Sequence, residues 1–384
     1  MTALPTGFRA YVTNVGIKDT SDDFVVVAAD AVCTTVGMFT TSSFAGASVI
    51  VSREHLAAPS SARAVVVISK NANVATGVDG LANAREVVGG VAAALGCAAS
   101  DVLIASTGVI GRQYPMDRIR VGLAAIPSQL PCHDIDPVAR GIMTTDTVPK
   151  IAEISVGEAR IVGVAKGVGM IEPNMATMIT LLLTDANVAA HDLDSIFKRV
   201  VDRTFNCVSI DTDTSTSDTA ILMASGAAGA VDMGAFEKGL YDVASSLTKQ
   251  IARDGEGAEK LIEVTVDEAA TPEQAKRVAK AIVNSPLVKT AVHGADPNWG
   301  RVAMAIGKST TADEVDQSKV IVRFGEQEVY PTPVDEAGLD ALATYMRGAE
   351  IQITVVLAVG NSSATVWGCD LTDGYVRINA DYTT

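Results

Sequence analysis

A glycine-rich loop leads directly into a threonine and a dense apolar run within residues 163–184. The glycines permit backbone angles that a side chain would forbid, and Pro173 fixes its own φ and holds the residue before it outside the helical region. Residues 178–183 are apolar apart from Thr180, which predicts a buried strand. Thr177 therefore stands between an adaptable loop and a rigid strand. That position suits chemistry, although an ordinary loop with a strand-initiating threonine fits the same residues.

The composition is that of a chain able to bury a sizeable core. It has 384 residues, of which 48% are hydrophobic and only 4% aromatic, so its apolar content is mainly Ala, Val, Ile and Leu. This is typical of an enzyme built from sheets and packed helices and not of a disordered protein. No apolar run reaches the roughly 18 residues that a membrane span needs. The N-terminal residues also lack the pattern of a signal peptide, and we expect a cytoplasmic protein.

Charge and cysteine usage exclude several classes of partner. The net charge is −15, of which −2 belongs to residues 1–176 and −13 to residues 177–384, and this disfavours nucleic acid and anionic membrane as partners. The odd number of scattered cysteines predicts neither a disulfide framework nor a zinc site. These cysteines are Cys33, Cys97, Cys132, Cys207 and Cys369.

Short β-rich segments alternate with segments whose apolar residues recur at helical spacing. We expect strands at residues 8–17, 24–29, 35–40, 48–52, 64–69, 101–106, 151–156, 159–165, 178–183, 261–266, 319–324, 351–359 and 364–369. We expect helices near 80–95, 116–126, 193–204, 235–253, 272–283, 299–306 and 336–347. Strands in groups with helices outside them predict an α+β or α/β layered sandwich.

The triplet Ser106-Thr107-Gly108 follows one of the buried strands. Backbone N–H groups and a hydroxyl at such a point could face a negatively charged oxygen, as an oxyanion hole requires. A plain strand-to-loop turn is the simpler interpretation of these three residues alone. The nearby glycines form neither GxGxxG nor a P-loop, so nucleotide binding has little support.

Two polar segments are weaker candidates. The loop Asn206–Asp218 carries three aspartates, Asp211, Asp213 and Asp218, which could bind Mg²⁺ or Ca²⁺. It lacks the glycine and final glutamate of an EF-hand, and a polar strand edge fits it as well. His293 lies in a turn before a helix, where a structural histidine is the simpler interpretation. With no GxSxG and no assignable Ser–His–Asp set, we expect no metal and no cofactor.

The stretch from Lys166 to Met178 resembles the self-cleavage and nucleophile motif of the ornithine acetyltransferase (glutamate N-acetyltransferase) family, most nearly the branch associated with clavulanic acid biosynthesis. Further segments match that family in the same order along the whole chain. They are Asn71–Gly77, Ser106–Gly111, Ile142–Thr147, Asp211–Thr219, Asp254–Gly257, Asp296–Arg301 and Asn379–Thr384.

The resemblance implies an αββα sandwich similar to the N-terminal-nucleophile hydrolases, with a smaller C-terminal α/β lobe. In such proteins the precursor cuts itself, here between Ala176 and Thr177, into an α chain 1–176 and a β chain 177–384 that fold together. Thr177 Oγ would attack the Ala176 carbonyl, and water would cleave the resulting ester. The new α-amine, with a pKa of about 7.7–8.0, could then serve as the nucleophile's own general base, so no histidine is needed.

The resemblance also implies roles for individual residues. Thr107 and Gly108 would form the oxyanion hole, Lys166 would bind a substrate carboxylate, and Glu256 would attract a cationic group of the substrate. The implied substrate-binding residues are Thr145, Lys166, Thr177, Glu256, Asn379 and Thr384. N²-acetylornithine would acetylate Thr177, and glutamate would then take the acetyl group. Glu172 departs from the family, in which a histidine often stands at this position.

Three hypotheses for the function follow from these residues. The first is this acetyltransferase, a small-molecule enzyme whose α and β fragments assemble as α₂β₂ or larger. The second is an amidase or aminopeptidase of the same fold, in which water accepts the acyl group. The third is a binding protein that has lost self-processing, which the intact Ala176–Thr177 pair disfavours. For the acetyltransferase we expect recycling of acetyl groups alone, without acetyl-CoA.

Overall fold

The structure is a computed structural model, and it describes residues 2–18, 20–57, 60–172 and 178–381. The chain divides into two compact units, each of which is described by itself. The first comprises Met1–Gly167, Pro173–Asn206 and Thr214–Leu247; the second comprises Val168–Glu172, Cys207–Asp213 and Thr248–Thr384. The first unit therefore draws residues from both sides of the Ala176–Thr177 bond.

Within the described residues, the first unit contains one eight-stranded sheet in the order β4-β3-β2-β8-β7-β6-β5, with β1 paired to β2. Its strands are β1 (Phe8–Thr13), β2 (Phe24–Phe39), β3 (Ser61–Ile68), β4 (Val102–Ser106), β5 (Lys150–Val156), β6 (Ala159–Lys166), β7 (Ile179–Asn187) and β8 (Thr219–Ala230). The long strand β2 joins two halves of this sheet. Its first part pairs with β1 and β3, and Thr34–Phe39 pair with β8.

Alternating residues of these strands face two separate hydrophobic cores. Val25 and Val27 of β2 pack in an inner core together with alternate residues of β6, β7 and β8, so the two halves of the sheet lie face to face. Phe24 and Val26 point the other way, into a core shared with three helices. These helices are α1 (Ala47–Leu56), α2 (Gly77–Leu95) and α3 (Met116–Ala124). The short helix α4 (Asp136–Gly141) contributes side chains to the inner core.

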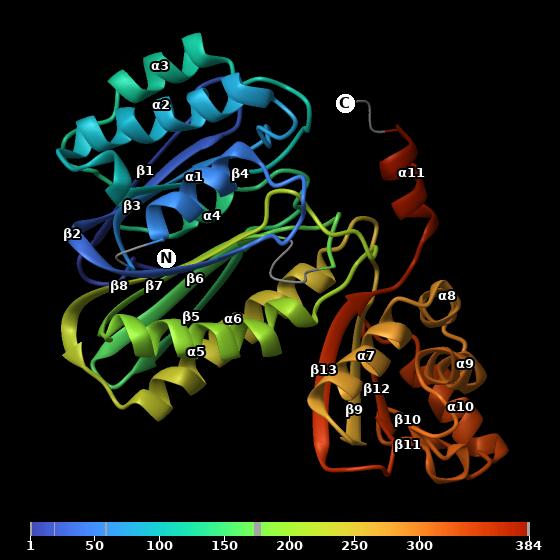
Figure 1. The fold of residues 1–384 in the computed structure, drawn as a ribbon. Helices are drawn as coiled ribbons and strands as arrows, with labels where there is room; N and C mark the ends of the chain where they lie inside the picture. The colour runs from blue at the N-terminus through green and yellow to red at the C-terminus, as the bar shows by residue number, and fades with distance from the viewer. Residues whose placement is uncertain (1, 19, 58–59, 173–177, 382–384) are drawn as a thin grey trace. The chain divides into compact units, whose positions relative to one another are not determined.

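Helix α5 (Ala190–Arg203) and the part of α6 (Met233–Arg253) up to Leu247 complete the first unit on the other side of the sheet. Gly163 of β6 leaves room for this packing, because a Cβ there would lie 2.9 Å from Leu247 Cδ1 of α6. The layers are therefore helices, sheet, sheet and helices (Figure 1). The predicted αββα layering is confirmed.

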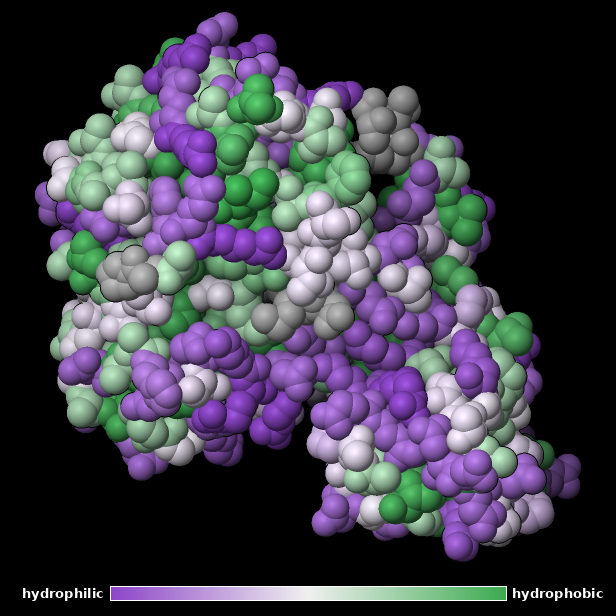
Figure 2. Space-filling model, in the orientation of Figure 1, coloured by the Kyte–Doolittle hydropathy of each residue, from purple (hydrophilic) through white to green (hydrophobic). Residues whose placement is uncertain are grey.

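The second unit is a smaller α/β lobe around a five-stranded sheet in the order β11-β10-β12-β9-β13, counted over the described chain. Its strands are β9 (Leu261–Ala269), β10 (Ile321–Phe324), β11 (Gln327–Tyr330), β12 (Glu350–Val356) and β13 (Ser362–Cys369). Its helices are α7 (Pro272–Val283), α8 (Pro286–His293), α9 (Trp299–Ser309), α10 (Glu336–Tyr345) and α11 (Asp373–Asp381). Helix α7 packs on β9 and β13. In Figure 2, hydrophilic residues predominate on the visible face of this unit.

One predicted strand is wrong. Residues 48–52 belong to α1, not to a strand, although Val49, Ile50 and Val51 are β-branched. The helix is set by packing, since Val49 and Val51 are fully buried and Ser52 Oγ donates to Ile104 O at 2.7 Å. The segments 24–29 and 35–40, expected as separate strands, are parts of the single strand β2.

Two further findings concern the chain as a whole. All five cysteines are free, as their spacing predicted. Among the residues that the structure describes, no helix is long and apolar enough to cross a membrane.

Candidate functional site

The candidate site is organised around the neighbouring ends of β6, β7 and β8. Lys166, the last residue of β6, is the cross-strand partner of Ile179, the first residue of β7. Met178, just before β7, is buried, and its carbonyl accepts the N–H of Thr219 at 2.9 Å. Ala176 and the predicted nucleophile Thr177 lie outside the described residues. The residue that follows Thr177 is nevertheless fixed to the sheet.

Thr107 and Gly108 follow β4 in this unit, and Thr107 Oγ1 accepts a hydrogen bond from Lys166 Nζ at 3.3 Å. Gly108 has a φ of +131°, and a Cβ at this position would lie 2.1 Å from the carbonyl carbon of Lys70. Only glycine fits so close to another backbone segment. The structure thus brings one predicted oxyanion residue, Thr107, into contact with a predicted substrate-binding residue, Lys166.

A buried ion pair between Asp146 and Lys150 lies close enough to Lys166 for the charge of Lys166 to act on Asp146. Asp146 Oδ1 lies 2.7 Å from Lys150 Nζ, and both side chains are fully buried. The same oxygen accepts the N–H of Gly167 at 2.8 Å. Burial raises the pKa of the Asp146 carboxyl, but the positive charges of Lys166 and Lys150 and the hydrogen bonds outweigh burial and hold this pKa below its usual value. Asp146 is therefore ionised at neutral pH.

Asp218, just before β8, is a second buried carboxyl near Lys166. It is 1% exposed. Burial raises the pKa of this carboxyl well above its usual value, although hydrogen bonds with the Ser215 and Thr40 side chains and with the Met178 N–H, and the charge of Lys166, oppose the rise. Among the described residues, the charge of Lys166 opposes the rise at Asp218, whereas the charges of both Lys166 and Lys150 act on Asp146.

The remaining predicted residue of the first unit is Thr145, which is exposed and directly precedes Asp146. The buried carboxylate accepts the N–H of Thr144 at 3.1 Å. This bond holds the short turn that presents Thr145 to solvent.

In the second unit, two predicted substrate-binding residues are in direct contact. Asn379 of α11 donates from Nδ2 to Glu256 Oε2 at 3.0 Å. Glu256 follows α6, and its N–H is bound by the carbonyl of Val168 at 2.8 Å. Gly169 admits the carboxylate, because a Cβ there would lie 2.5 Å from Glu256 Oε2. The glycine predicted to loosen the loop thus has a steric role. Thr384 lies outside the described residues.

Acidic groups also surround Tyr375 of α11. Burial, together with the charges of Asp211, Glu256 and Asp213, raises the pKa of the Tyr375 hydroxyl to about 12. Asp211 accepts the N–H groups of Met170 and Ile171 at 2.6 and 2.7 Å. This part of the second unit carries negative charge, which favours a cationic ligand.

Glu172, where the family resemblance predicts a different residue, is held within the second unit. Its Oε2 accepts hydrogen bonds from Asn284 Nδ2 at 2.6 Å and from Ser209 Oγ at 3.1 Å, and its Oε1 lies 3.4 Å from Lys280 Nζ. These contacts hold the Glu172 side chain against α7 and the residue that follows it within the second unit.

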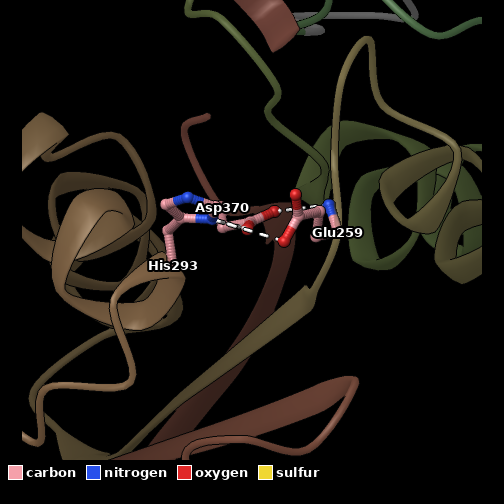
Figure 3. A group of neighbouring side chains, drawn as sticks. All are labelled: Glu259, His293 and Asp370. Atoms are coloured by element: carbon pink, nitrogen blue, oxygen red, sulfur yellow. Dashed lines mark hydrogen bonds and ion pairs between the residues drawn. The ribbon is translucent and has the colours of Figure 1, made fainter. Parts of the chain in front are cut away.

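Among the described residues, one group has side chains placed as metal ligands could be: Glu259, His293 and Asp370, whose ligand atoms lie within 4.8 Å of one another (Figure 3). His293 Nδ1 is 3.1 Å from Asp370 Oδ2 and 3.7 Å from Glu259 Oε2. Asp370 Oδ1 accepts the backbone N–H groups of Glu259 and Lys260, both at 2.9 Å. These hydrogen bonds fix Asp370 beside His293.

The aspartate-rich loop does not form a cation site in the part of the chain that the structure describes. Asp211 binds two backbone N–H groups of the second unit, whereas Asp218 is buried in the first. The loop is also not the edge of a strand. Its aspartates organise the backbone instead.

Sequence reasoning missed Asp146, Lys150 and the structural role of Asp218. Each was visible in a quoted motif or next to one, but burial of a charge leaves no mark in a single sequence. The one available signal was charge within otherwise apolar or hydroxyl-rich segments, as at Asp146 and Lys150, which flank three uncharged residues.

Comparison with known proteins gives consistent results. The model of the ArgJ family matches residues 9–384. The chain is 55% identical over 380 residues to the arginine biosynthesis bifunctional protein ArgJ 2 of Nostoc sp., covering 99% of this chain and 98% of that protein. It is also 55% identical over 386 residues to the glutamate N-acetyltransferase Oat2 of Streptomyces clavuligerus, again covering 99% and 98%. The crystal structure of ArgJ from Bacillus halodurans matches with 42% identity and a TM-score of 0.49, covering 52% of this chain and 96% of that one.

Proposed function

Because this chain belongs to the ArgJ family, we propose that it is a glutamate N-acetyltransferase that moves the acetyl group of N²-acetyl-L-ornithine to L-glutamate. The observation that carries this proposal is the 55% identity, over nearly the whole of both chains, to an enzyme named for that activity. Small-molecule amino acids are therefore the substrates. No cofactor takes part in the reaction written below.

The first step is self-cleavage. Thr177 Oγ attacks the Ala176 carbonyl carbon, its proton passes to the departing Thr177 nitrogen, and the peptide bond becomes an ester. Water then hydrolyses the ester and leaves a carboxylate on Ala176 and a free amine on Thr177. The resulting chains, 1–176 and 177–384, remain associated because β6 and β7, one from each chain, are hydrogen-bonded neighbours in one sheet.

The second step is acyl transfer in two halves. The Thr177 amine, with a pKa near neutrality, accepts the Oγ proton while Oγ attacks the acetyl carbonyl of acetylornithine. The tetrahedral oxyanion is stabilised by Thr107 and Gly108, ornithine leaves with the proton, and an acetyl ester remains on Thr177. The amine of glutamate attacks this ester, so acetylglutamate leaves and Thr177 is restored.

Charge supports the roles of the binding residues. Lys166 binds a substrate carboxylate, and its position is fixed by the contact with Thr107 and by the charge of Asp146. Glu256 attracts a cationic amino group of the substrate, and Asn379 orients its carboxylate. Thr145 and Thr384 supply hydroxyls to the substrate.

Three finer points belong to the same proposal. The enzyme recycles acetyl groups and does not use acetyl-CoA as a donor. Its α and β fragments assemble as α₂β₂ or larger, and it acts in the cytoplasm.

Intact mass analysis of the purified protein tests the self-cleavage. We expect two fragments, one ending at Ala176 and one beginning at Thr177, and a single uncut chain for Thr177→Ala. Thr180→Val is a matched control, because the buried Thr180 hydroxyl in β7 has no hydrogen-bond partner among the described residues, so its loss should leave cleavage unchanged. A wild-type protein that is active but uncut would contradict the mechanism.

The transferase and the hydrolase are separated by supplying acetylornithine with and without glutamate. A transferase releases ornithine in proportion to the acetylglutamate formed. Equal ornithine release without glutamate, and no acetylglutamate with it, would identify an amidase of the same fold.

A further inference from the structure

Asp218 lies opposite Met178 at the start of two parallel strands. In the register of β7 and β8, Ile179 pairs with Thr219, so the residues before them are also adjacent. The Thr219 N–H donates to the Met178 carbonyl at 2.9 Å, and the Met178 N–H donates to the Asp218 carboxyl. Both backbone polar groups of Met178 are thus held by residues 218 and 219.

The Asp218 carboxyl is confined by its surroundings. The Thr40 hydroxyl donates to the Ser215 carbonyl at 2.6 Å, and the Thr40 N–H donates to the Asp218 carbonyl at 3.0 Å. The charged group that faces the carboxyl is Lys166, which also faces Asp146. Within the described chain, Asp218 Oδ2 is buried without a hydrogen-bond partner.

A carboxyl in this state weakens the fold. A buried polar atom without a partner is destabilising, and such atoms are rare in native proteins. An apolar or amide side chain would avoid part of this cost. The position of the group therefore calls for a functional explanation, and within the described chain the carboxyl contacts the amide of Met178, the residue just before β7.

We propose that Asp218 is a positioning residue for the nucleophile: it holds the Met178 amide and thereby fixes the point at which Thr177 joins β7. The inference rests on the proposed role of Thr177. Met178 N is bonded to the Thr177 carbonyl carbon, so a fixed Met178 amide limits the movement of the residue before it. Displacement of a reacting group by about 1 Å can slow a reaction on the order of a hundredfold.

Two substitutions separate this role from simple stability. Asp218→Ala removes the acceptor of the Met178 N–H, whereas Asp218→Asn keeps a carbonyl oxygen in the same place. The matched control is Asp185→Ala, near the other end of β7, where a 2%-exposed aspartate accepts the N–H groups of Thr6 and Arg160 at 3.1 and 2.7 Å.

The rate of self-cleavage is followed by intact mass, and kcat and KM are measured on the processed fraction. For Asp218→Ala we expect cleavage and kcat to fall on the order of ten- to a hundredfold, with KM little changed. Asp218→Asn should stay within a few-fold of wild type. Asp185→Ala should lower the unfolding temperature without slowing cleavage. Cleavage by Asp218→Ala at the wild-type rate would overturn the proposal.

Amide hydrogen exchange of Met178 gives a readout that does not depend on cleavage. The Met178 N–H should exchange at least about tenfold faster in Asp218→Ala than in wild type, and should remain protected in Asp218→Asn and Asp185→Ala. Retained protection in Asp218→Ala would overturn the proposal even if catalysis fell. If the wild type is never cut, the proposed function fails, while the exchange of Met178 still decides whether Asp218 holds its amide.

Discussion

Asp146 and Asp218 are both buried near Lys166, yet the pKa values of their carboxyl groups shift in opposite directions. Asp146 has a second cation, Lys150, at 2.7 Å and a hydrogen bond from the Gly167 N–H. Among the residues that the structure describes, Asp218 has the charge of Lys166 nearby and one oxygen without a hydrogen-bond partner. Burial penalises the charged form of both, so the number of facing cations decides which carboxyl ionises.

Because their charges differ, Asp146 and Asp218 can have different roles near Lys166. An ionised Asp146 balances the positive charges of Lys150 and Lys166 and ties Gly167 to the end of β6. A carboxyl at Asp218 that favours its neutral form adds no charge, so it can accept the Met178 N–H without weakening the attraction of Lys166 for a substrate carboxylate. Substitutions of Asp146, Asp218 or Lys166 test this comparison directly.

The largest effect is expected for Asp146→Ala, which leaves Lys150 buried without its counter-charge. Breaking a buried ion pair in this way should lower the free energy of unfolding by about 3–5 kcal/mol, measured by chemical denaturation. The control is Asp136→Ala at the exposed Arg140–Asp136 pair, 2.8 Å apart, where a loss below about 1 kcal/mol is expected. Equal losses at both sites would mean that the Asp146–Lys150 pair is not buried as described.

Lys166→Met should have the next largest effect, because it removes the cation that lies near both Asp146 and Asp218. Asp146 still keeps its ion pair with Lys150. A charge-assisted contact is worth roughly 1.5–3 kcal/mol, so kcat/KM for acetylornithine should fall by roughly ten- to a hundredfold. Steady-state kinetics are compared with Lys238→Met, which alters an exposed pair on α6 and should change nothing. An unchanged kcat/KM for Lys166→Met would remove Lys166 from the binding site.

More of the fold than of the candidate site could be predicted from the sequence. The helix expected near residues 272–283 is confirmed as α7, which Thr271 caps and Pro272 begins. The strand at 178–183 was predicted because an apolar run of that length, interrupted only by Thr180, is typical of a buried strand. Residues 48–52 were predicted wrongly, since tertiary packing overrode their β-branched composition. The family resemblance, carried by several motifs in order, is confirmed by the match over residues 9–384.

The contacts of the site were less predictable than its members. The motifs named Lys166, Thr107, Glu256 and Asn379, but their pairing at 3.3 and 3.0 Å comes from strands and helices far apart in the chain. Only the assembled fold brings such residues together. The buried cation Lys150 was not named at all, because its role depends on exclusion from water, which a single sequence does not record.

The pH dependence of stability offers a third test. The folded-state pKa of Asp146 is lowered, so its contribution to stability is present above the unfolded pKa of about 3.9 and is lost as the pH falls through the folded value. The free energy of unfolding of wild type should therefore fall in acid more steeply than that of Asp146→Asn. Denaturation between neutral pH and pH ~3 measures this, and parallel curves would contradict the shift.

The smallest effect on stability is expected for Asp218→Asn. The folded-state pKa of Asp218 is raised, so its contribution is present below the unfolded pKa and is lost as the pH rises towards the folded value. At neutral pH an amide avoids this loss, and Asp218→Asn should be neutral or slightly stabilising, within about 1 kcal/mol. Asp146→Asn removes the negative charge beside Lys150 and should be destabilising under the same conditions. If both variants lost stability alike at neutral pH, the two carboxyls would share one ionisation state, and the neutral character assigned to Asp218 would be wrong.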